Sequence, residues 1–163
     1  MVAGQDGVLV GSSGGGSTWY TELENIKYLQ FTNAAGYVNL SCPCALAALK
    51  KLGYTYAVTR ASYGLNSRVG GSSATTRMAQ VTKPSATFLL GDGSVAGAND
   101  GFAIGINANA NGNLLTSYHS AKCAITYFDG HAQFVDSDFL DKINNKAEIK
   151  KEGSEASVFW NGY

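Results

Sequence analysis

The stretch SYHSAKCAITYFDGHAQFVDSDFL, residues 117–140, holds both histidines of the chain. His119 is followed by nine residues, then by Asp129-Gly130 and then by His131. Histidine and aspartate are the residue types of an acid–base pair or of a metal site. If residues 119–128 run extended, however, His119 lies roughly 30 Å from Asp129, at about 3.3 Å per residue. The two side chains then cannot meet within their own segment, and the spacing fits the length of a strand better than a reaction centre.

The Asp-Gly pair is also a strong local signal for a β-hairpin. AKCAITYF and HAQFV flank Asp129-Gly130, which suits the two central positions of a type I′ turn. A two-residue loop pairs Phe128 with His131 and Ile125 with Phe134. This register predicts one apolar face, formed by Cys123, Ile125, Tyr127, Ala132 and Phe134. The other face, with His131 on its polar side, carries Lys122, Thr126 and Gln133.

No serine, cysteine or threonine stands at a spacing typical of a nucleophilic motif. The GDGS at residues 91–94 has Asp92 where the nucleophile elbow G-x-S-x-G requires serine. His119 is therefore interpreted as a strand-end residue bonded to backbone, and Asp129 as the first turn residue. We predict no catalytic residues and no enzymatic activity.

The three cysteines are an odd number and too few for a disulfide framework. Cys42-Pro43-Cys44 is C-x-C rather than C-x-x-C, so neither a thioredoxin-type redox site nor a zinc knuckle fits it well. We favour three buried thiols, with a bridge from Cys123 to Cys42 or Cys44 as the alternative. No cofactor is predicted from these residues.

Length and composition indicate one domain with a real core. The chain has 163 residues, of which 45% are hydrophobic and 15% charged, and its formal net charge is zero. A neutral chain does not suit the phosphates of nucleic acid or an anionic membrane surface. No apolar run approaches the roughly 20 residues of a membrane span. Residues 1–17 are interpreted as a flexible leader without the features of a signal peptide.

The elements expected along the chain are of α+β class. Helices are predicted at residues 19–31 and 45–53, and the latter ends at a glycine. Extended segments are predicted at 54–58, 61–71 and 102–106, with a central strand at 88–90. A long loop is expected over the Asn- and Gly-rich residues 95–113. The domain is placed at residues 18–144, with a tail at 145–163 whose Phe159 and Trp160 pack back onto the body or onto a neighbour.

Several short motifs resemble, in order, those of the prepilin-type processing-associated H-x(9)-DG domain family. The main signature is His119, Asp129-Gly130-His131 and Phe134-Val135. Upstream, Cys42-Pro43 resembles the Cys-Pro of the family, and Tyr63-Gly64-Leu65-Asn66 resembles its Tyr-Gly-x-Asn segment. Pro84-Ser85, followed by a strand that ends at Asp92, resembles its Pro-Ser strand. The resemblance covers roughly residues 19–137.

This resemblance implies a pilin- or pseudopilin-like fold, in which the remnant of an N-terminal helix packs on an antiparallel sheet with a C-terminal hairpin. It implies a structural subunit of a type II secretion or type IV pilus-like filament, processed as a prepilin and methylated at its mature N-terminus. Its partners would be like subunits and the assembly machinery, and no nucleic acid. The full-length form would be anchored in the inner membrane by a helix that this sequence lacks, with its soluble domain in the periplasm or at the cell surface.

Two alternatives stay open beside the structural subunit. Secretion pseudopilins as a class bind calcium in a C-terminal loop, and calcium takes several oxygen ligands. The candidates here are Asp92, Asn99, Asp100, Asp136, Asp138 and Asp141. The spacing of the last three is also typical of a helix start. The other alternative is a carbohydrate- or polymer-binding module that uses flat aromatic faces, with candidates Trp19, Tyr20, Tyr54, Tyr56, Tyr118 and Trp160.

Overall fold

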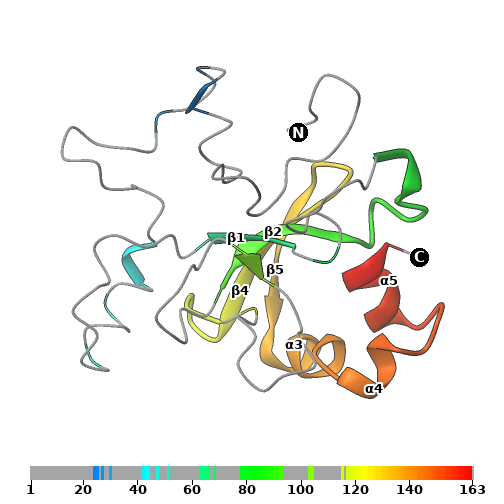
Figure 1. Cartoon of the computed structure of the whole chain (residues 1–163). Helices are drawn as coiled ribbons and strands as arrows, with labels where there is room; N and C mark the ends of the chain where they lie inside the picture. Colours follow the sequence, from blue (N-terminus) through cyan, green and yellow to red (C-terminus); the bar gives the residue numbers. More distant parts are fainter. Residues whose placement is uncertain are drawn as a thin grey trace.

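One open sheet of five strands organises the computed structural model of the chain (Figure 1). The structure describes residues 63–66, 68, 78–93, 103–104, 115 and 117–162, together with isolated positions between residues 24 and 51. The strands follow the spatial order β3-β1-β2-β4-β5. Their bounds are β1 Tyr63–Asn66, β2 Phe88–Asp92, β3 Ala103–Ile104, β4 Lys122–Tyr127 and β5 Ala132–Asp136.

The general α+β class is confirmed, and the sheet is antiparallel along β1, β2, β4 and β5. The two-residue strand β3 departs from the prediction because it pairs with β1 in parallel. The predicted strand at 88–90 is confirmed as the central strand β2, which continues through Gly91 to Asp92. Helical positions occur at 24 and 25 and at 43, 44, 47 and 51. The leader at 1–17 and the strand predicted at 54–58 lie outside the described residues.

Three short helices follow the sheet and lie together beside it, coloured orange to red in Figure 1. They are α3 (Ser137–Ile143), α4 (Lys146–Ile149) and α5 (Glu155–Asn161). Each begins at a capping side chain that accepts a backbone N–H of the first turn, as helix starts require. The capping residues are Asp136, Asn145 and Ser154. The helix start predicted from Asp136 and Asp138 is therefore confirmed.

Helix α5 completes the hydrophobic core, so the C-terminal tail packs back onto the body. Trp160 and Phe159 are buried and contact Phe88 of β2, with ring centroids 5.4 Å apart in both pairs. Trp160 Nε1 donates a hydrogen bond to the Ile143 carbonyl of α3 at 2.8 Å. Asn66 of β1 donates to the carbonyls of Phe88 and Trp160 at 2.8 and 3.0 Å. One buried amide thereby joins β1, β2 and α5.

The predicted hairpin of β4 and β5 exists, but its predicted register is wrong by one residue. The observed pairs include Thr126 with Ala132 and Ala124 with Phe134. Val135, rather than Phe134, therefore shares the buried face with Cys123. Phe134 is 62% exposed, and a one-residue shift turns every side chain of a strand to the opposite face.

A three-residue loop causes this shift. Tyr127 N donates to the His131 carbonyl and Gly130 N donates to the Tyr127 carbonyl, with Gly130 at φ 94°. This arrangement matches a three-residue hairpin loop with a left-handed glycine rather than the two-residue type I′ turn. Phe128 takes the extra place because it is buried and packs in a small cluster with Val81. Its backbone N–H also donates to the Thr87 carbonyl at 3.1 Å.

A second tight turn stands at the other end of β4 and was not predicted. His119 and Lys122 exchange two backbone hydrogen bonds of 3.0 Å across Ser120 and Ala121. Both central residues have positive φ, 51° and 63°, which is the conformation of a type I′ turn. The chain therefore doubles back at this point, and the extended run predicted from residue 119 begins only at Lys122.

Replacing Ala121 by glycine is expected to raise the free energy of unfolding by about 0.5 kcal/mol, because the left-handed conformation costs roughly 1–2 kcal/mol for a residue with a Cβ. Part of this gain is lost to the larger entropy of glycine in the unfolded chain. Urea denaturation measures the change. The matched control is Ala147→Gly in α4, where the same substitution should destabilise the protein; equal losses at both positions would contradict the turn conformation.

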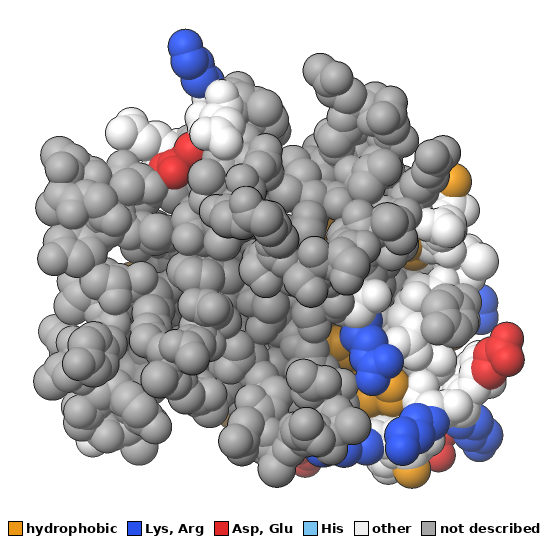
Figure 2. All heavy atoms as spheres, in the orientation of Figure 1, with side chains coloured by type: hydrophobic (Ala, Val, Ile, Leu, Met, Phe, Trp, Pro, Cys, Tyr) orange, Lys and Arg blue, Asp and Glu red, His pale blue; other side chains and the backbone are white. Residues whose placement is uncertain are grey.

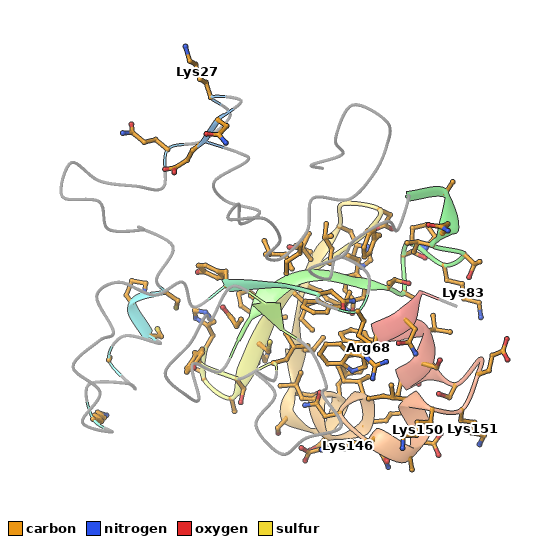
Figure 3. All side chains as sticks on the ribbon, in the orientation of Figure 1. Lys27, Arg68, Lys83, Lys146, Lys150 and Lys151 are labelled. Carbon is orange, nitrogen blue, oxygen red and sulfur yellow. The ribbon has the colours of Figure 1, made fainter. Side chains whose placement is uncertain are left out.

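Charged side chains are mixed on the helical part of the molecule (Figure 2). Lys146, Lys150 and Lys151 lie at the α4 end (Figure 3). Lys151 has Glu148 at 4.0 Å, and Lys142 pairs with Glu155 at 2.5 Å. Positively and negatively charged side chains are therefore mixed on this part of the surface. None of the helices among the described residues combines the length and the apolar character that a membrane span requires.

Candidate functional site

Cys42, Cys44 and His119 come together at one end of the sheet. One ligand atom from each lies within 4.8 Å of the others, and no other set of three His, Cys, Asp or Glu residues does so in the described part of the chain. The Cys42 Sγ is 3.4 Å from the His119 Nε2. Cys42 is buried, Cys44 is exposed and the His119 side chain is 29% exposed. The prediction of three buried thiols is thus wrong for Cys44, and none of the cysteines forms a disulfide.

Local structure positions each of these side chains. Cys42 directly precedes Pro43 and Cys44, which are both helical. Proline suits the first turn of a helix because it lacks the N–H that would be unpaired there. His119 is held by the turn through Ser120 and Ala121. Its ring also contacts the ring of Phe134 edge-on, with centroids 5.8 Å apart.

Asp92 extends the cluster from the end of β2. Its side chain is fully buried, and its Oδ2 lies 3.3 Å from the same His119 Nε2 that faces Cys42. The backbone N–H of Ala124 donates to Oδ2 at 2.8 Å. Oδ1 is buried without a hydrogen-bond partner. Burial raises the pKa of Asp92, while the Ala124 N–H and His119 act in the opposite direction.

Tyr63 lies opposite Asp92 in the pairing of β1 with β2. Burial raises its pKa to about 12, and the negative charges that Cys42 and Asp92 can carry act in the same direction. A hydrogen bond between Tyr63 and Cys42 also favours the neutral phenol. Tyr63 is therefore a neutral hydrogen-bonding neighbour of Cys42 rather than a phenolate.

The geometry differs from that of a cysteine–histidine–aspartate catalytic triad. In a triad, the carboxylate holds one ring nitrogen while the other nitrogen faces the nucleophile. Here the same nitrogen, His119 Nε2, faces both the Cys42 sulfur and the Asp92 carboxylate. A single ring nitrogen cannot accept the thiol proton and donate to the carboxylate together. The converging sulfur and nitrogen atoms of Cys42, Cys44 and His119 are instead typical of a metal site.

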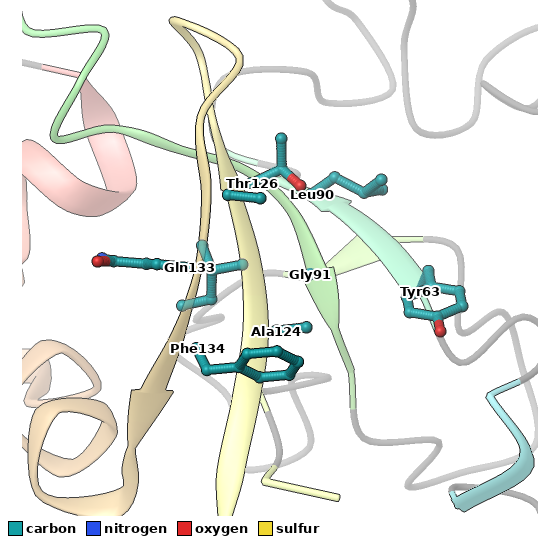
Figure 4. Close-up of a pocket in the computed structure, with 9 residues that line it drawn as sticks. Tyr63, Leu90, Gly91, Ala124, Thr126, Gln133 and Phe134 are labelled. Carbon is teal, nitrogen blue, oxygen red and sulfur yellow. The ribbon is translucent and has the colours of Figure 1, made fainter. Parts of the chain in front are cut away.

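A groove of about 380 Å³ adjoins this cluster on the outer face of the sheet (Figure 4). Its lining includes Tyr63 of β1, Leu90 of β2, Ala124 and Thr126 of β4, and Phe134 of β5. The groove is a consequence of the hairpin register, because Phe134 would otherwise point into the core. It is an apolar surface that a polymer or another polypeptide could cover.

Asp129, Gly130 and His131 of the predicted signature lie at the hairpin loop at the far end of β4, while Phe134 and Val135 belong to β5. Asp129 Oδ1 accepts hydrogen bonds from the His131 backbone N–H at 3.1 Å and lies 2.6 Å from the His131 Nδ1. The His131 ring stacks on Tyr127, with centroids 4.3 Å apart. Asp129 follows β4, whereas His119 precedes it. The two residues lie at opposite ends of the strand, and Asp129 interacts with His131 instead.

The pKa of Asp129 is expected to lie below its ordinary value, mainly because the His131 backbone N–H donates to the carboxylate. A lowered pKa means that this interaction stabilises the fold above the unfolded-state pKa and is lost as the pH falls through the folded-state pKa. Replacing His131 by alanine should raise the pKa only part of the way, since the backbone N–H remains. NMR titration of the Asp129 carboxyl in the variant measures this pKa. A pKa equal to the ordinary value of an aspartate would contradict the role of the backbone N–H.

The residues predicted as calcium ligands are not gathered in the described part of the chain. Asp136 caps α3 by accepting the Phe139 N–H at 2.9 Å, and Asp138 lies exposed in the first turn. Asp141 is an exposed residue of the same helix. Asn99 and Asp100 lie outside the described residues. Asp92 is the exception, because it belongs to the cluster with His119.

The other marker residues have structural positions. Gly64 is buried in β1, and Asn66 makes the buried amide contacts to β2 and α5. Pro84 is exposed and accepts a hydrogen bond from Asp129 N at 3.3 Å, which anchors the hairpin loop. Trp160, named as an aromatic candidate for carbohydrate binding, is fully buried and cannot serve as a binding platform.

Sequence reasoning missed the joining of Cys42 and Cys44 with His119. Cys42 and His119 are 77 residues apart in the sequence, and C-x-C is not a common zinc spacing. The only signal in the sequence was the presence of two cysteines and a histidine, which are residue types that zinc takes as ligands. Comparison with known proteins finds no family model that matches the chain, no similar curated protein and no similar solved structure.

Proposed function

We propose that the chain is a non-enzymatic structural subunit, the soluble domain of a pilin- or pseudopilin-like protein from a type II secretion or type IV pilus-like filament. The observation that carries this proposal is the position of the signature residues. His119 is held in the tight turn that precedes β4, and Asp129 and Gly130 form the loop that follows it. Residues with such positions define the length of a strand. The similarity of the motifs to the H-x(9)-DG family supplies the functional class.

The apolar groove supports a role in packing against other polypeptides. It lies on the sheet face that carries Tyr63, Leu90 and the largely exposed Phe134. A filament requires contacts of one subunit with the next that do not close into a ring. A sheet face with an apolar groove is one surface that can make such contacts. In the full-length protein this subunit would be anchored by a hydrophobic N-terminal helix and would lie in the periplasm or at the cell surface.

Mass spectrometry of the native protein, purified from the membrane and surface fractions of its host, tests the proposal. We expect a mature N-terminus that begins with a methylated residue at the head of a hydrophobic helix, upstream of the sequence described. Deletion of the prepilin peptidase should leave the longer, unmethylated form. A native protein that begins at Met1 and fractionates independently of the peptidase would overturn the proposal.

The second candidate is a carbohydrate- or polymer-binding module, and the exposed Phe134 beside Tyr63 favours it. Aromatic rings at the edge of an open groove can stack on the apolar faces of sugars. Affinity electrophoresis through soluble polysaccharides tests this function. The binding module is favoured if a polysaccharide slows the migration of the wild-type chain and of Phe139→Ala but not that of Phe134→Ala. Unretarded migration of the wild-type chain through every polysaccharide would exclude it.

A further inference from the structure

We propose that Cys42, Cys44, His119 and Asp92 form a tetrahedral zinc site that ties the Cys42–Cys44 segment to the sheet. This inference goes beyond the structural-subunit function and does not depend on it. Thiolate sulfur, imidazole nitrogen and carboxylate oxygen are the ligand atoms that Zn²⁺ takes in proteins. The calcium that the acidic loops suggested would require a set made only of oxygen ligands, which these residues do not supply.

The distance between the first two ligand atoms already fits a tetrahedral ion. With Zn–S of about 2.3 Å and Zn–N of about 2.0–2.1 Å, a tetrahedron separates its sulfur and nitrogen ligands by about 3.5 Å. The Cys42 Sγ and the His119 Nε2 are 3.4 Å apart. The Cys44 sulfur lies within 4.8 Å of both atoms. Cys44 is exposed and needs to move by only a fraction of this distance to complete a triangle of ligands.

Asp92 is the fourth ligand of the proposed site, and its carboxylate has to move toward the sulfur atoms on binding, because it lies near His119 but outside the set of atoms that are within 4.8 Å of one another. A tetrahedral zinc with Zn–O of about 2.0–2.2 Å places an oxygen about 3.3 Å from a nitrogen ligand. Asp92 Oδ2 is 3.3 Å from His119 Nε2. The carboxylate is fully buried, and its second oxygen has no hydrogen-bond partner. A buried carboxylate is costly unless a cation or several donors compensate its charge, and an ion at this position would do so.

The conflict at the His119 nitrogen is the second argument for an ion. Nε2 faces both the Cys42 sulfur and the Asp92 oxygen, and it has either one proton or one lone pair to offer. Nε2 can therefore make a hydrogen bond to only one of these two neighbours at a time. A metal ion removes this conflict, because the Cys42 sulfur and His119 Nε2 then both direct lone pairs at the ion, and the Asp92 carboxylate can turn toward it as well. Convergence of this kind distinguishes a ligand set from an ordinary hydrogen-bond network.

The surroundings hold the ligands in place. The tight turn through Ser120 and Ala121 fixes the backbone of His119, and the edge-on Phe134 ring contacts its imidazole. Tyr63 is hydrogen-bonded to Cys42, and the Ala124 N–H is bonded to Asp92. Hydrogen bonds from neighbours to the ligands are a regular property of zinc sites and orient the coordinating atoms.

Titration of the reduced chain with Zn²⁺ against a chromophoric chelator, under anaerobic conditions, tests the site. We expect one ion per chain and a higher melting temperature with zinc, because an ion that binds the folded state stabilises it. Co²⁺ should replace Zn²⁺ and give the strong d–d absorption of a tetrahedral ion together with thiolate-to-cobalt charge-transfer bands. Less than one ion per chain, or cobalt spectra without thiolate bands, would overturn the proposal.

Two pairs of variants locate the ion. Cys44→Ser and His119→Gln should each weaken zinc binding by at least 100-fold, since loss of a mere neighbour of a ligand already costs about 10–100-fold. The matched controls are Cys123→Ala and His131→Gln, which change the remaining cysteine and the remaining histidine and should leave the affinity unchanged. Cys44 is exposed, so its replacement should not disturb the fold. Wild-type affinity in Cys44→Ser or His119→Gln would overturn the proposal.

Asp92→Asn distinguishes four protein ligands from three. We expect zinc to bind this variant more weakly, by about 10-fold or more, with a changed cobalt d–d spectrum but preserved thiolate bands. Unchanged affinity and an unchanged spectrum would remove Asp92 from the proposed set. A disulfide between Cys42 and Cys44 that forms in air and persists in the presence of zinc would overturn the zinc site in favour of a redox pair.

Discussion

Replacing Trp160 by alanine should lower the free energy of unfolding by about 3–5 kcal/mol, because such truncations of large buried residues leave a cavity. Trp160 is fully buried and contacts the rings of Phe88 and Phe159, and its Nε1 hydrogen bond ties α5 to α3. A domain of this size has a total stability of only about 5–15 kcal/mol. The variant should therefore be largely unfolded at temperatures where the wild type is folded.

Urea denaturation followed by circular dichroism measures this effect, and Trp160→Phe is the matched variant. Phenylalanine keeps most of the apolar contact and leaves the Ile143 carbonyl without its donor, so it should cost less, about 1–3 kcal/mol. An exposed aromatic, Phe134→Ala, should change the stability by less than about 0.5 kcal/mol. Equal losses for Trp160→Ala and Phe134→Ala would contradict the packing of α5.

Asn66→Ala should have the second-largest effect, a loss of about 2–4 kcal/mol, since each buried group left unpaired costs about 1–3 kcal/mol. The Asn66 amide is fully buried and donates to the carbonyls of Phe88 and Trp160. Its oxygen accepts the Arg68 N–H at 3.0 Å. Alanine removes all three contacts and leaves two carbonyls in the core with fewer partners.

The matched control is Asn145→Ala, which removes the hydrogen bond from the Ala147 N–H to the Asn145 side-chain oxygen at the exposed start of α4. Loss of a helix cap costs about 0.5–2 kcal/mol, so this variant should be clearly more stable than Asn66→Ala. Thermal unfolding by calorimetry compares the two. If Asn66→Ala were no less stable than Asn145→Ala, the buried amide would not hold β1 to α5.

Local patterns predicted β2, β4, β5 and the start of α3, whereas helices α4 and α5 were not predicted within the tail at 145–163. Alternating apolar residues and the Asp129-Gly130 pair located β4 and β5, and the acids near residue 136 located the start of α3. The register was wrong because it depends on a contact that no local pattern contains. Phe128 is drawn into the cluster with Val81, and its N–H binds the Thr87 carbonyl, so the loop takes three residues instead of two.

The turn at Ser120 and Ala121 escaped prediction for a different reason. Both residues adopt positive φ, which normally selects glycine or asparagine. Their conformation is imposed by the surrounding structure against their own preference. The turn also redirects His119 toward Cys42, and this meeting joins segments 77 residues apart. The candidate site could therefore not be predicted from spacing, although the residue types that form it were visible.

The late position of α5 along the chain determines when this protein can fold. Residues 155–161 bring in the two aromatic rings that cover β2, and Gly162 accepts hydrogen bonds from both the backbone N–H and the hydroxyl of Thr82. A nascent polypeptide that has emerged only as far as β5 still exposes the apolar side of its sheet. The core of the sheet can therefore close only after residues 155–161 have been synthesised, so the strands made earlier wait for α5 with their apolar side uncovered.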